Sequence, residues 1–479
     1  MLDPLSYPDP LRKTVTWAGL ATYTALAVLA VVFYKERIAF ADLAFQLFTI
    51  LQENNMTIQN MRFGAAITEI VPLLSGRLGL GLKTITVLYS LAFVGWYAFV
   101  FAVCIWSRAT RWALVMLLLS TLMVTHTFYW AQSELPQGLA FMVLFMAVYQ
   151  RWLLGRWPVW GLPVLTVGLF TLAFFHPTLF IPSCFCCLFF ILRDKQGRAD
   201  YAWLIVTLLL LSFIKTRVFH TGYDTENLKR TAQLFTLFPH YFSTTSFQKL
   251  LGWLVTDYYA LTLGLLAVLA YYGWQRQWLR LALVGGSFLA YSILVTGSYP
   301  NGQEQQFYLE NLLLPLTIFI AVPLAFDVLP TVPLRWAVGI VVLVVLVRVA
   351  HIGLAHSPYT DRLHWAQRVL RRTEHLPQRK LLFADQDIPM DTAMMTFATP
   401  YEFWLLSSLE KPYQARSIVI CGNPDEHSGD LDKKNAFIAA WGVFDYAALP
   451  PKYFSFSAAD TTTYRRADYK QLVTPPVKW

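Results

Sequence analysis

The sequence contains few charged residues and few cysteines. Lys, Arg, Asp and Glu make up 14% of its 479 residues, whereas a soluble domain has about 25%. The deficit comes from apolar runs of roughly 14 to 20 residues, most of them near the length that spans a bilayer. Five cysteines are too few for a disulfide framework, and four of them lie in apolar runs. The composition excludes a disulfide-stabilised secreted domain and indicates a helical membrane protein.

Several sequence motifs are also missing. There is no internal repeat and no GxxxxGK[ST], GxGxxG or HExxH motif, which disfavours an ATP-driven pump and zinc proteases of the HExxH class. The cluster Cys184-Phe-Cys-Cys187 is interpreted as membrane packing residues rather than a metal site. The net charge is +9, but no basic run is clustered like a nucleic-acid-binding face, so we expect no nucleic acid partner. The first apolar run is too long for a cleavable signal.

The apolar runs predict about eleven membrane-spanning helices. They lie at about 15–34, 87–106, 113–130, 137–150, 158–175, 178–192, 201–214, 257–273, 281–296, 312–328 and 336–354. With the N-terminus in the cytoplasm, the short loops that contain Lys and Arg fall inside. The short turns 131–136 and 175–178 contain neither residue and fall outside. We therefore expect an integral protein of a bacterial inner (plasma) membrane.

This topology places the polar segments on one face. Residues 1–355 are predicted to form an all-α polytopic bundle with long outer loops at 35–86 and 215–255. The shorter loop 297–311 falls on the same side. Residues 356–479 are predicted to form a small αβ domain on the outer face. Its predicted elements are strands at Lys380–Ala384 and Ser417–Cys421 and a helix at Thr399–Leu409.

Two carboxylates in the outer segments are candidate catalytic groups. Asp42 follows the first apolar run in a mixed stretch that we expect to lie along the membrane interface. Partial shielding from water would raise its pKa and suit it to act as a general base, with a helix N-cap as the alternative role. Glu134 is the only acid between Glu69 and Asp194. A carboxylate between two spans must be solvated or paired, and the alternative is a plain turn that starts a helix.

A second group of outer residues is predicted to bind a phosphate. Arg and Lys suit phosphate recognition, and outer loops do not need positive charge for topology. The candidates are Arg62, His176, Lys215, Arg217, His220, Lys229 and Arg230, with Glu304, Tyr308 and Glu310 expected to line the same cavity. Binding of anionic lipid headgroups is the alternative for the basic loop. A structural role is the alternative for His176, and a cap in the first helical turn is the alternative for Glu310.

These features together resemble the GT-C superfamily of polytopic glycosyltransferases, which includes protein O-mannosyltransferases and aminoarabinose transferases of lipid A. The resemblance covers the bundle. Its local parts are Arg37-Ile-Ala-Phe-Ala-Asp42, the run from Arg62-Phe-Gly to Pro72-Leu-Leu before Tyr89-Ser90, Ser133-Glu134 and Tyr308-Leu-Glu-Asn-Leu-Leu-Leu-Pro315. It implies that Asp42 is the base that activates the acceptor. It also implies that Glu134 is a second acid after the third span, and that the donor is a sugar on a polyprenyl phosphate.

The sequence departs from this family in its acidic motifs. Many members have two adjacent acids in the first loop, whereas here Asp42 stands alone. No Asp-x-Asp pair occurs in the bundle, and the two in the tail, Asp385-Gln-Asp387 and Asp430-Leu-Asp432, lie outside the position of the family motif. This argues against a required divalent metal, and no other cofactor is expected.

The predicted activity is transfer of a sugar from a polyprenyl-phosphate-linked donor to an acceptor at the outer face, by single displacement. One alternative is a non-enzymatic subunit of a larger membrane complex that keeps a transferase-like bundle. The other is a lipid or solute transporter, which the missing repeat and the one-sided polar residues disfavour. The expected partners are the lipid-linked donor, membrane lipids and, in the first alternative, other membrane proteins.

Overall fold

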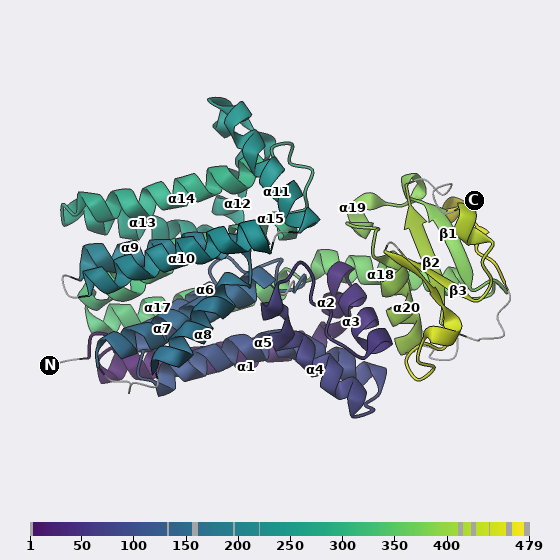
Figure 1. Cartoon of the computed structure of the whole chain (residues 1–479), viewed down its shortest axis with the longest axis horizontal. Helices are drawn as coiled ribbons and strands as arrows, with labels where there is room; N and C mark the ends of the chain where they lie inside the picture. The colour runs from purple at the N-terminus through teal and green to yellow at the C-terminus, as the bar shows by residue number, and fades with distance from the viewer. Residues whose placement is uncertain are drawn as a thin grey trace.

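Helices make up most of the structure, and they form a long bundle that leads into a small C-terminal region of helices and strands (Figure 1). The computed structural model describes residues 3–131, 134–155, 161–194, 197–219, 221–410, 415–422, 428–439, 441–456 and 462–473. Among these, five helices are long and apolar enough to cross a membrane, with up to seven spans if two sharply bent helix pairs each count as one. The structure is consistent with an integral membrane protein.

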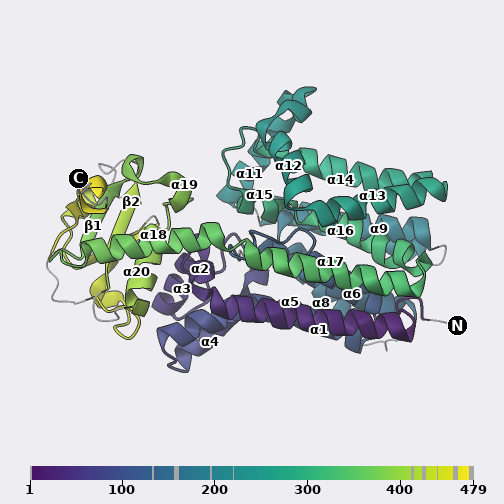
Figure 2. The ribbon, with the colours of Figure 1, turned by 180° about the vertical axis from the view of Figure 1, so that it is seen from behind.

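The candidate spans run along the bundle. The long helices are α1 (Asp9–Val32), α5 (Leu82–Trp106), α10 (Arg198–Val218), α14 (Trp278–Ser298) and the run Leu334–Thr373, which contains α17 (Leu334–Leu354) and α18 (Ser357–Thr373). The bent pairs are α12 (Thr245–Thr256) with α13 (Tyr259–Trp274), at 89°, and α15 (Gln306–Leu313) with Pro315–Thr331, which contains α16 (Pro315–Pro323), at 45°. The α18 helix continues beyond the end of the bundle into the C-terminal region (Figure 2).

The two ends of the bundle differ in what they carry. The N-terminus lies at one end, here called the far end (Figure 1). The C-terminal region lies beside the other, here called the domain end. The helices of the two long loops are at the domain end: α2 (Tyr34–Ile38), α3 (Ala41–Glu53), α4 (Ala66–Arg77) and α11 (Gly222–Ala232). The long loops predicted to share one face therefore do lie at the same end of the bundle.

The remaining bundle helices are shorter or less apolar, and they show where one predicted span is wrong. They are α6 (Thr110–Leu119), α7 (Glu134–Leu153), α8 (Gly161–Ala173) and α9 (Phe180–Arg193). The predicted span 113–130 is helical only as far as Leu119. Beyond it, the Glu310 carboxylate accepts hydrogen bonds from the backbone N–H groups of residues 125–127, at 2.8 to 3.0 Å. Buried Arg348 donates to the carbonyls of residues 121 and 124. Charged side chains thus replace helical hydrogen bonds.

The C-terminal region contains a small parallel sheet. Predicted strands at Lys380–Ala384 (β1) and Ser417–Cys421 (β2) are confirmed, and they pair in parallel with Lys380 opposite Ser417. The helix between them, α20 (Thr399–Glu410), provides the crossover that parallel strands need. The other elements are β5 (Arg465–Arg466), which pairs with β1, the hairpin of β3 (Ala436–Ala439) and β4 (Gly442–Asp445), and the short helices α19 (Met390–Ala393), α21 (Ser428–Leu431) and α22 (Tyr469–Val473).

Helix α3 belongs to the core of the C-terminal region as much as to the bundle. The ring of Phe48 on α3 lies 4.9 to 5.2 Å from the rings of five aromatic residues of that region, which are Tyr401, Trp404, Phe437, Phe444 and Phe454. Most of α3 is buried. The expectation that this stretch lies along the membrane interface is therefore wrong, because the C-terminal region covers it. The covered helix places Asp42 where bundle and C-terminal region meet.

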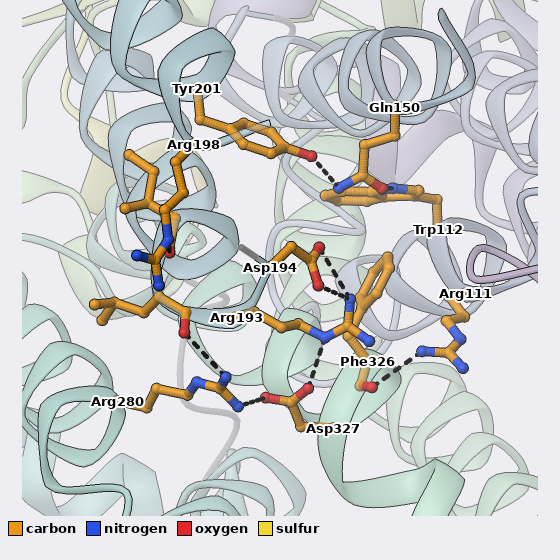
Figure 3. Close-up of polar contacts among 12 residues, drawn as sticks. Arg111, Trp112, Gln150, Arg193, Asp194, Arg198, Tyr201, Arg280, Phe326 and Asp327 are labelled. Atoms are coloured by element: carbon orange, nitrogen blue, oxygen red, sulfur yellow. Dashed lines mark hydrogen bonds and ion pairs between the residues drawn. The ribbon is translucent and has the colours of Figure 1, made fainter. Parts of the chain in front are cut away.

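At the far end, buried charges are paired with one another (Figure 3). The Asp327 carboxylate accepts from Arg193 Nε at 2.8 Å and from Arg280 Nη1 at 3.1 Å. It also accepts from the Tyr272 hydroxyl at 2.8 Å. Nearby, Arg111 donates to the carbonyl of Phe326 at 3.1 Å. Arginines that the sequence places in short basic loops thus join separate helices, in addition to any role in membrane orientation.

Candidate functional site

A cavity of about 970 Å³ lies at the domain end of the bundle, between α10, α11, α14, α15 and the loop before α9. Its polar lining residues include Arg62, His176, Lys215, Arg217, Tyr223, Asp224, Arg230, Tyr299 and Tyr308. Its apolar wall includes Leu172, Phe180, Ile181, Leu208, Phe213, Leu294, Val295 and Leu312. Six of the predicted phosphate-site residues therefore line one cavity, although the sequence separates them by up to 246 positions, from Arg62 to Tyr308.

Arg62 connects the cavity to a buried carboxylate. Its Nη1 lies 2.6 Å from Glu134 Oε2, and its Nη2 lies 3.2 Å from Asp224 Oδ1. The side chains of Arg62 and Glu134 are 5% and 9% exposed, so this pair is shielded from solvent. Burial acts to lower the pKa of Arg62, but the charges of Glu134 and Asp224 outweigh it and the net shift is upward. The carboxylate Glu134 is thus paired, as a buried acid requires.

Two other cations on the cavity have no carboxylate partner among the described residues. Lys215 Nζ donates to the carbonyl of Ala173 at 2.9 Å and is buried. The guanidinium of Arg230 lies 5.8 Å from the ring centre of Tyr299. Arg62 and Arg217 also line the cavity, and Asp224 is the lining carboxylate among the described residues. The two cations without a described carboxylate partner, beside a partly apolar wall, favour an anionic ligand with an apolar portion.

His176 and Tyr308 line the cavity in different ways. His176 precedes the short helix Pro177–Leu179, and its Nδ1 lies 2.8 Å from Thr178 Oγ1. Burial, and then the charge of Arg62, hold the pKa of His176 well below its usual range, so the ring is neutral and caps a helix. The Tyr308 hydroxyl lies 3.0 Å from the Tyr299 hydroxyl. These contacts support the structural role of His176 and leave hydroxyl groups facing the cavity.

Asp42 lies near Glu134 and is not a lining residue of the cavity. Burial raises the pKa of Asp42 to about 7, and the charges of Glu134 and Glu402 add to the shift. The N-cap alternative is wrong, because Phe40 occupies that position and Glu402 Oε1 accepts from the Ala41 N–H at 2.6 Å instead. Ala41 has φ of 43°, a conformation that costs energy in a non-glycine residue. A carboxyl group that titrates near neutrality is suited to proton transfer.

The remaining predicted site residues lie elsewhere. Glu310 does not line the cavity, because its carboxylate is taken up by residues 125–127 and by the Tyr258 hydroxyl at 2.8 Å. Nor is it a first-turn cap, since α15 begins four residues earlier. Glu304 is half-buried in the loop before α15 and is not a lining residue. Lys229 is exposed and pairs with Glu226. His220 and Ser133 lie outside the described residues.

Three acids near the site were not predicted from the sequence. Asp224 completes the Arg62 bridge from 162 positions away, and Glu402 reaches Ala41 from 361 positions away, so no local pattern indicates either contact. Burial raises the pKa of Glu69 to about 8, although its Oε2 accepts from the Thr57 N–H at 2.7 Å. The only available signal for Glu69 was its isolation as an acid in a mixed segment.

The site combines a cavity rich in cations with a buried carboxyl group that titrates near neutral pH. The described residues bring together no group of three or more His, Cys, Asp or Glu side chains placed to hold a metal ion. Comparison with protein-family models, with curated proteins and with solved structures finds no match for this chain.

Proposed function

We propose that this chain transfers a sugar from a polyprenyl-phosphate-linked donor to an acceptor hydroxyl at the outer face of a membrane. The observation that supports this most is the cavity of about 970 Å³, in which cationic side chains and an apolar wall adjoin each other. A lipid-linked phosphate has the same two parts. Lys215 and Arg230, whose charges have no carboxylate partner in the described structure, would bind the phosphate.

The proposed reaction is a single displacement in which Asp42 is the general base. Asp42 takes the proton from the acceptor hydroxyl as that oxygen attacks the anomeric carbon. The bond from the anomeric carbon to the phosphate oxygen breaks, and the polyprenyl phosphate leaves with the electron pair. Lys215 and Arg230 stabilise the charge that develops on this leaving group. The pair of Arg62 with Glu134 connects the two halves of the site, since Arg62 lines the cavity and Glu134 contributes to the raised pKa of Asp42.

The proposal includes an orientation in the membrane. Exposed tryptophans occur at helix ends next to the predicted inner loops: Trp106, Trp274, Trp278 and Trp336 are 81%, 82%, 64% and 59% exposed. Tryptophan is enriched at membrane interfaces, and Lys and Arg in short cytoplasmic loops. We therefore place the far end in the cytoplasm of a bacterium and the cavity outside. In this arrangement the shorter helices α6 to α9 complete a GT-C-like bundle of about eleven spans.

The test separates donor binding from chemistry. Wild type, Lys215→Ala/Arg230→Ala and Asp42→Asn are purified in mild detergent, and their bound lipids are identified by mass spectrometry. We expect a polyprenyl phosphate on wild type and Asp42→Asn, and its loss from the double variant. In membranes that supply the acceptor, release of polyprenyl phosphate from an added donor should then be lost in Asp42→Asn. Bulk phospholipid alone on all three proteins, or wild-type turnover by Asp42→Asn, would contradict the proposal and favour a non-enzymatic subunit or a transporter.

A further inference from the structure

The second long loop contains a segment that lies across the bundle rather than along it. This segment comprises η3 (Gln233–Leu237), η4 (His240–Ser243) and α12, and is here called the platform, residues 233–256. Helix α12 meets the candidate span α13 at 89°. In Figure 1 the loop that carries the platform projects sideways from the domain end of the bundle. If α13 follows the membrane normal, α12 lies in the plane of the membrane surface.

The side chains of η3 separate into two faces. Leu234 and Leu237 pack on α14 at Gly297, where a Cβ atom would lie only 2.2 Å from Leu234 Cδ1. A side chain at position 297 would force Leu234 to move from this position. The two phenylalanines point the other way, because Phe235 is 81% exposed and Phe238 is 73% exposed. An apolar pair spaced by three residues thus holds the segment to the bundle, and an aromatic pair of the same spacing faces outward.

Helix α12 also has apolar side chains on both a buried face and an exposed face. Phe247 and Leu250 are buried against the protein, whereas Leu251 and Val255 are 45% and 73% exposed. Leu251 and Val255 are four residues apart and lie on one helix face. Around the corner, Leu263 of α13 is 64% exposed. Exposed apolar side chains therefore occur on both the candidate span and the helix perpendicular to it, on either side of the bend at residues 257–258.

We propose that the platform is a membrane-docking surface that inserts its apolar face into the outer leaflet of the bilayer. A soluble protein rarely exposes an apolar patch of this kind to water. A helix with one apolar face that lies parallel to a bilayer is stabilised by burial of that face at the boundary of headgroups and acyl chains. Lipid, rather than another protein, is the partner that fits, because the platform adjoins α13, a candidate membrane span whose Leu263 and Leu266 are also exposed.

The position of the platform has a consequence for the cavity. Arg230 and Thr231 line the cavity and lie two or three residues before the platform begins. A platform fixed at headgroup depth holds this rim of the cavity at the depth of lipid phosphates. The docking surface itself does not depend on the proposed reaction, since it rests only on the geometry and exposure of residues 233–256.

The test measures the environment of single labelled positions in nanodiscs of the full chain. The half-buried Cys184 and Cys421 are replaced by alanine, and spin-labelled cysteines are introduced as Phe235→Cys, Phe238→Cys and Val255→Cys. The matched controls are Glu226→Cys, on the polar helix α11 of the same loop, and Met390→Cys, which is 43% exposed in the C-terminal region. Each label is then tested for relaxation by oxygen, which partitions into lipid, and by a water-soluble nickel chelate.

We expect the three platform labels to be reached by oxygen and protected from nickel, and the two control labels to show the opposite. Nickel accessibility at the platform equal to that at Glu226→Cys would overturn the proposal, because the face would then be in water. Protection from both reagents would also overturn it, since that result indicates a protein partner. A melting temperature within error of the unlabelled protein, measured for each variant, ensures that the labels report on the folded chain.

Discussion

Both ends of the bundle contain arginines that are at least partly buried, but the two ends differ in whether those arginines are paired with carboxylates. At the far end the two oxygens of Asp327 are shared by Arg193, Arg280 and the Tyr272 hydroxyl, so the buried charges are matched (Figure 3). At the domain end, the cavity cations Lys215 and Arg230 have no carboxylate partner among the described residues, whereas Arg62 pairs with Glu134 and Asp224. A matched cluster holds helices together, whereas unmatched cations around a cavity raise the free energy of the protein until an anion binds.

Glu310 is a predicted site residue whose carboxylate is instead satisfied by the protein itself. It is fully buried, and a buried acid in a membrane bundle is a functional candidate by default. Its hydrogen bonds to the backbone of residues 125–127 and to Tyr258 leave the carboxylate satisfied. It therefore resembles Asp327 rather than the cavity residues. The predictions below test whether matched and unmatched charges behave differently when they are removed.

The largest expected effect on stability comes from the paired charges at the far end. Asp327→Ala leaves the half-buried Arg280 without a carboxylate partner among the described residues and Arg193 with only Asp194, and breaking a buried ion pair costs about 3–5 kcal/mol. We expect a large fall in melting temperature, measured by differential scanning fluorimetry in detergent. Asp194→Asn is the control, because Asp194 also pairs with Arg193 but its side chain is 40% exposed. Equal melting temperatures for the two variants would show that the Asp327 cluster does not hold the far end together.

The second prediction concerns the buried ion pair of Arg62 with Glu134 at the domain end. Arg62→Gln leaves Glu134 buried and unpaired, so we expect a fall in melting temperature that is smaller than for Asp327→Ala, because Asp224 and the cavity are partly open to water. The double variant Arg62→Gln/Glu134→Gln should recover most of the stability, since both charges are removed together. If the double variant is as unstable as Arg62→Gln, the ion pair is not the cause.

The third prediction concerns the buried acid beside the cavity. The pKa of Asp42 is raised from 3.8 to about 7, so between these values the folded state keeps a proton that the unfolded state has lost. Its contribution to stability is complete below pH 3.8, falls by at most about 1.4 kcal/mol per pH unit through this window, and is level above pH 7. Asp42→Asn removes this titration. Its melting temperature relative to wild type should therefore rise between pH 5 and pH 7.5.

The exposed Asp361 provides the control for this measurement. Asp361→Asn should show no comparable change relative to wild type over the same pH range. If the two variants follow the same pH dependence, Asp42 titrates like a solvated carboxyl group and is unsuited to the proposed role as base. If transfer activity is measured, it should increase as pH rises through about 7, because the base form of Asp42 is then populated.

The sequence predicts those features that depend on local patterns. Strands β1 and β2 are short apolar runs bounded by turn residues, and both appear where expected. The cations of the cavity could be found because basic residues in an outer loop need a reason beyond topology. Contacts over long distances in sequence could not be found. The third span fails for this reason, since Glu310, about 185 positions away, satisfies backbone groups that a helix would otherwise satisfy.

The pairing of Arg62 had no local signal either. Periodicity shows which face of a helix is apolar, but not which distant acid meets a given arginine. Without Asp224 and Glu134, Arg62 reads as an open phosphate ligand. With them, the charge of Arg62 is already balanced by two carboxylates. The sequence therefore identified six residues of one cavity together with others that lie elsewhere, and the structure was needed to show how the charge of Arg62 is paired.

The smallest effect on stability is expected for Arg230, and comparing it with Arg193 tests the difference between the two ends of the bundle most directly. Arg230→Gln removes a cation that has no carboxylate partner among the described residues, so the melting temperature should stay within the error expected for a change of about 0.5 kcal/mol. Retention of an anionic lipid, quantified by mass spectrometry, should nevertheless fall. Arg193→Gln, which removes a matched cation, should do the reverse and lower the melting temperature without changing the bound lipid. If Arg230→Gln destabilises the protein as much as Arg193→Gln, Arg230 has a structural partner and the two ends of the bundle use charge in the same way.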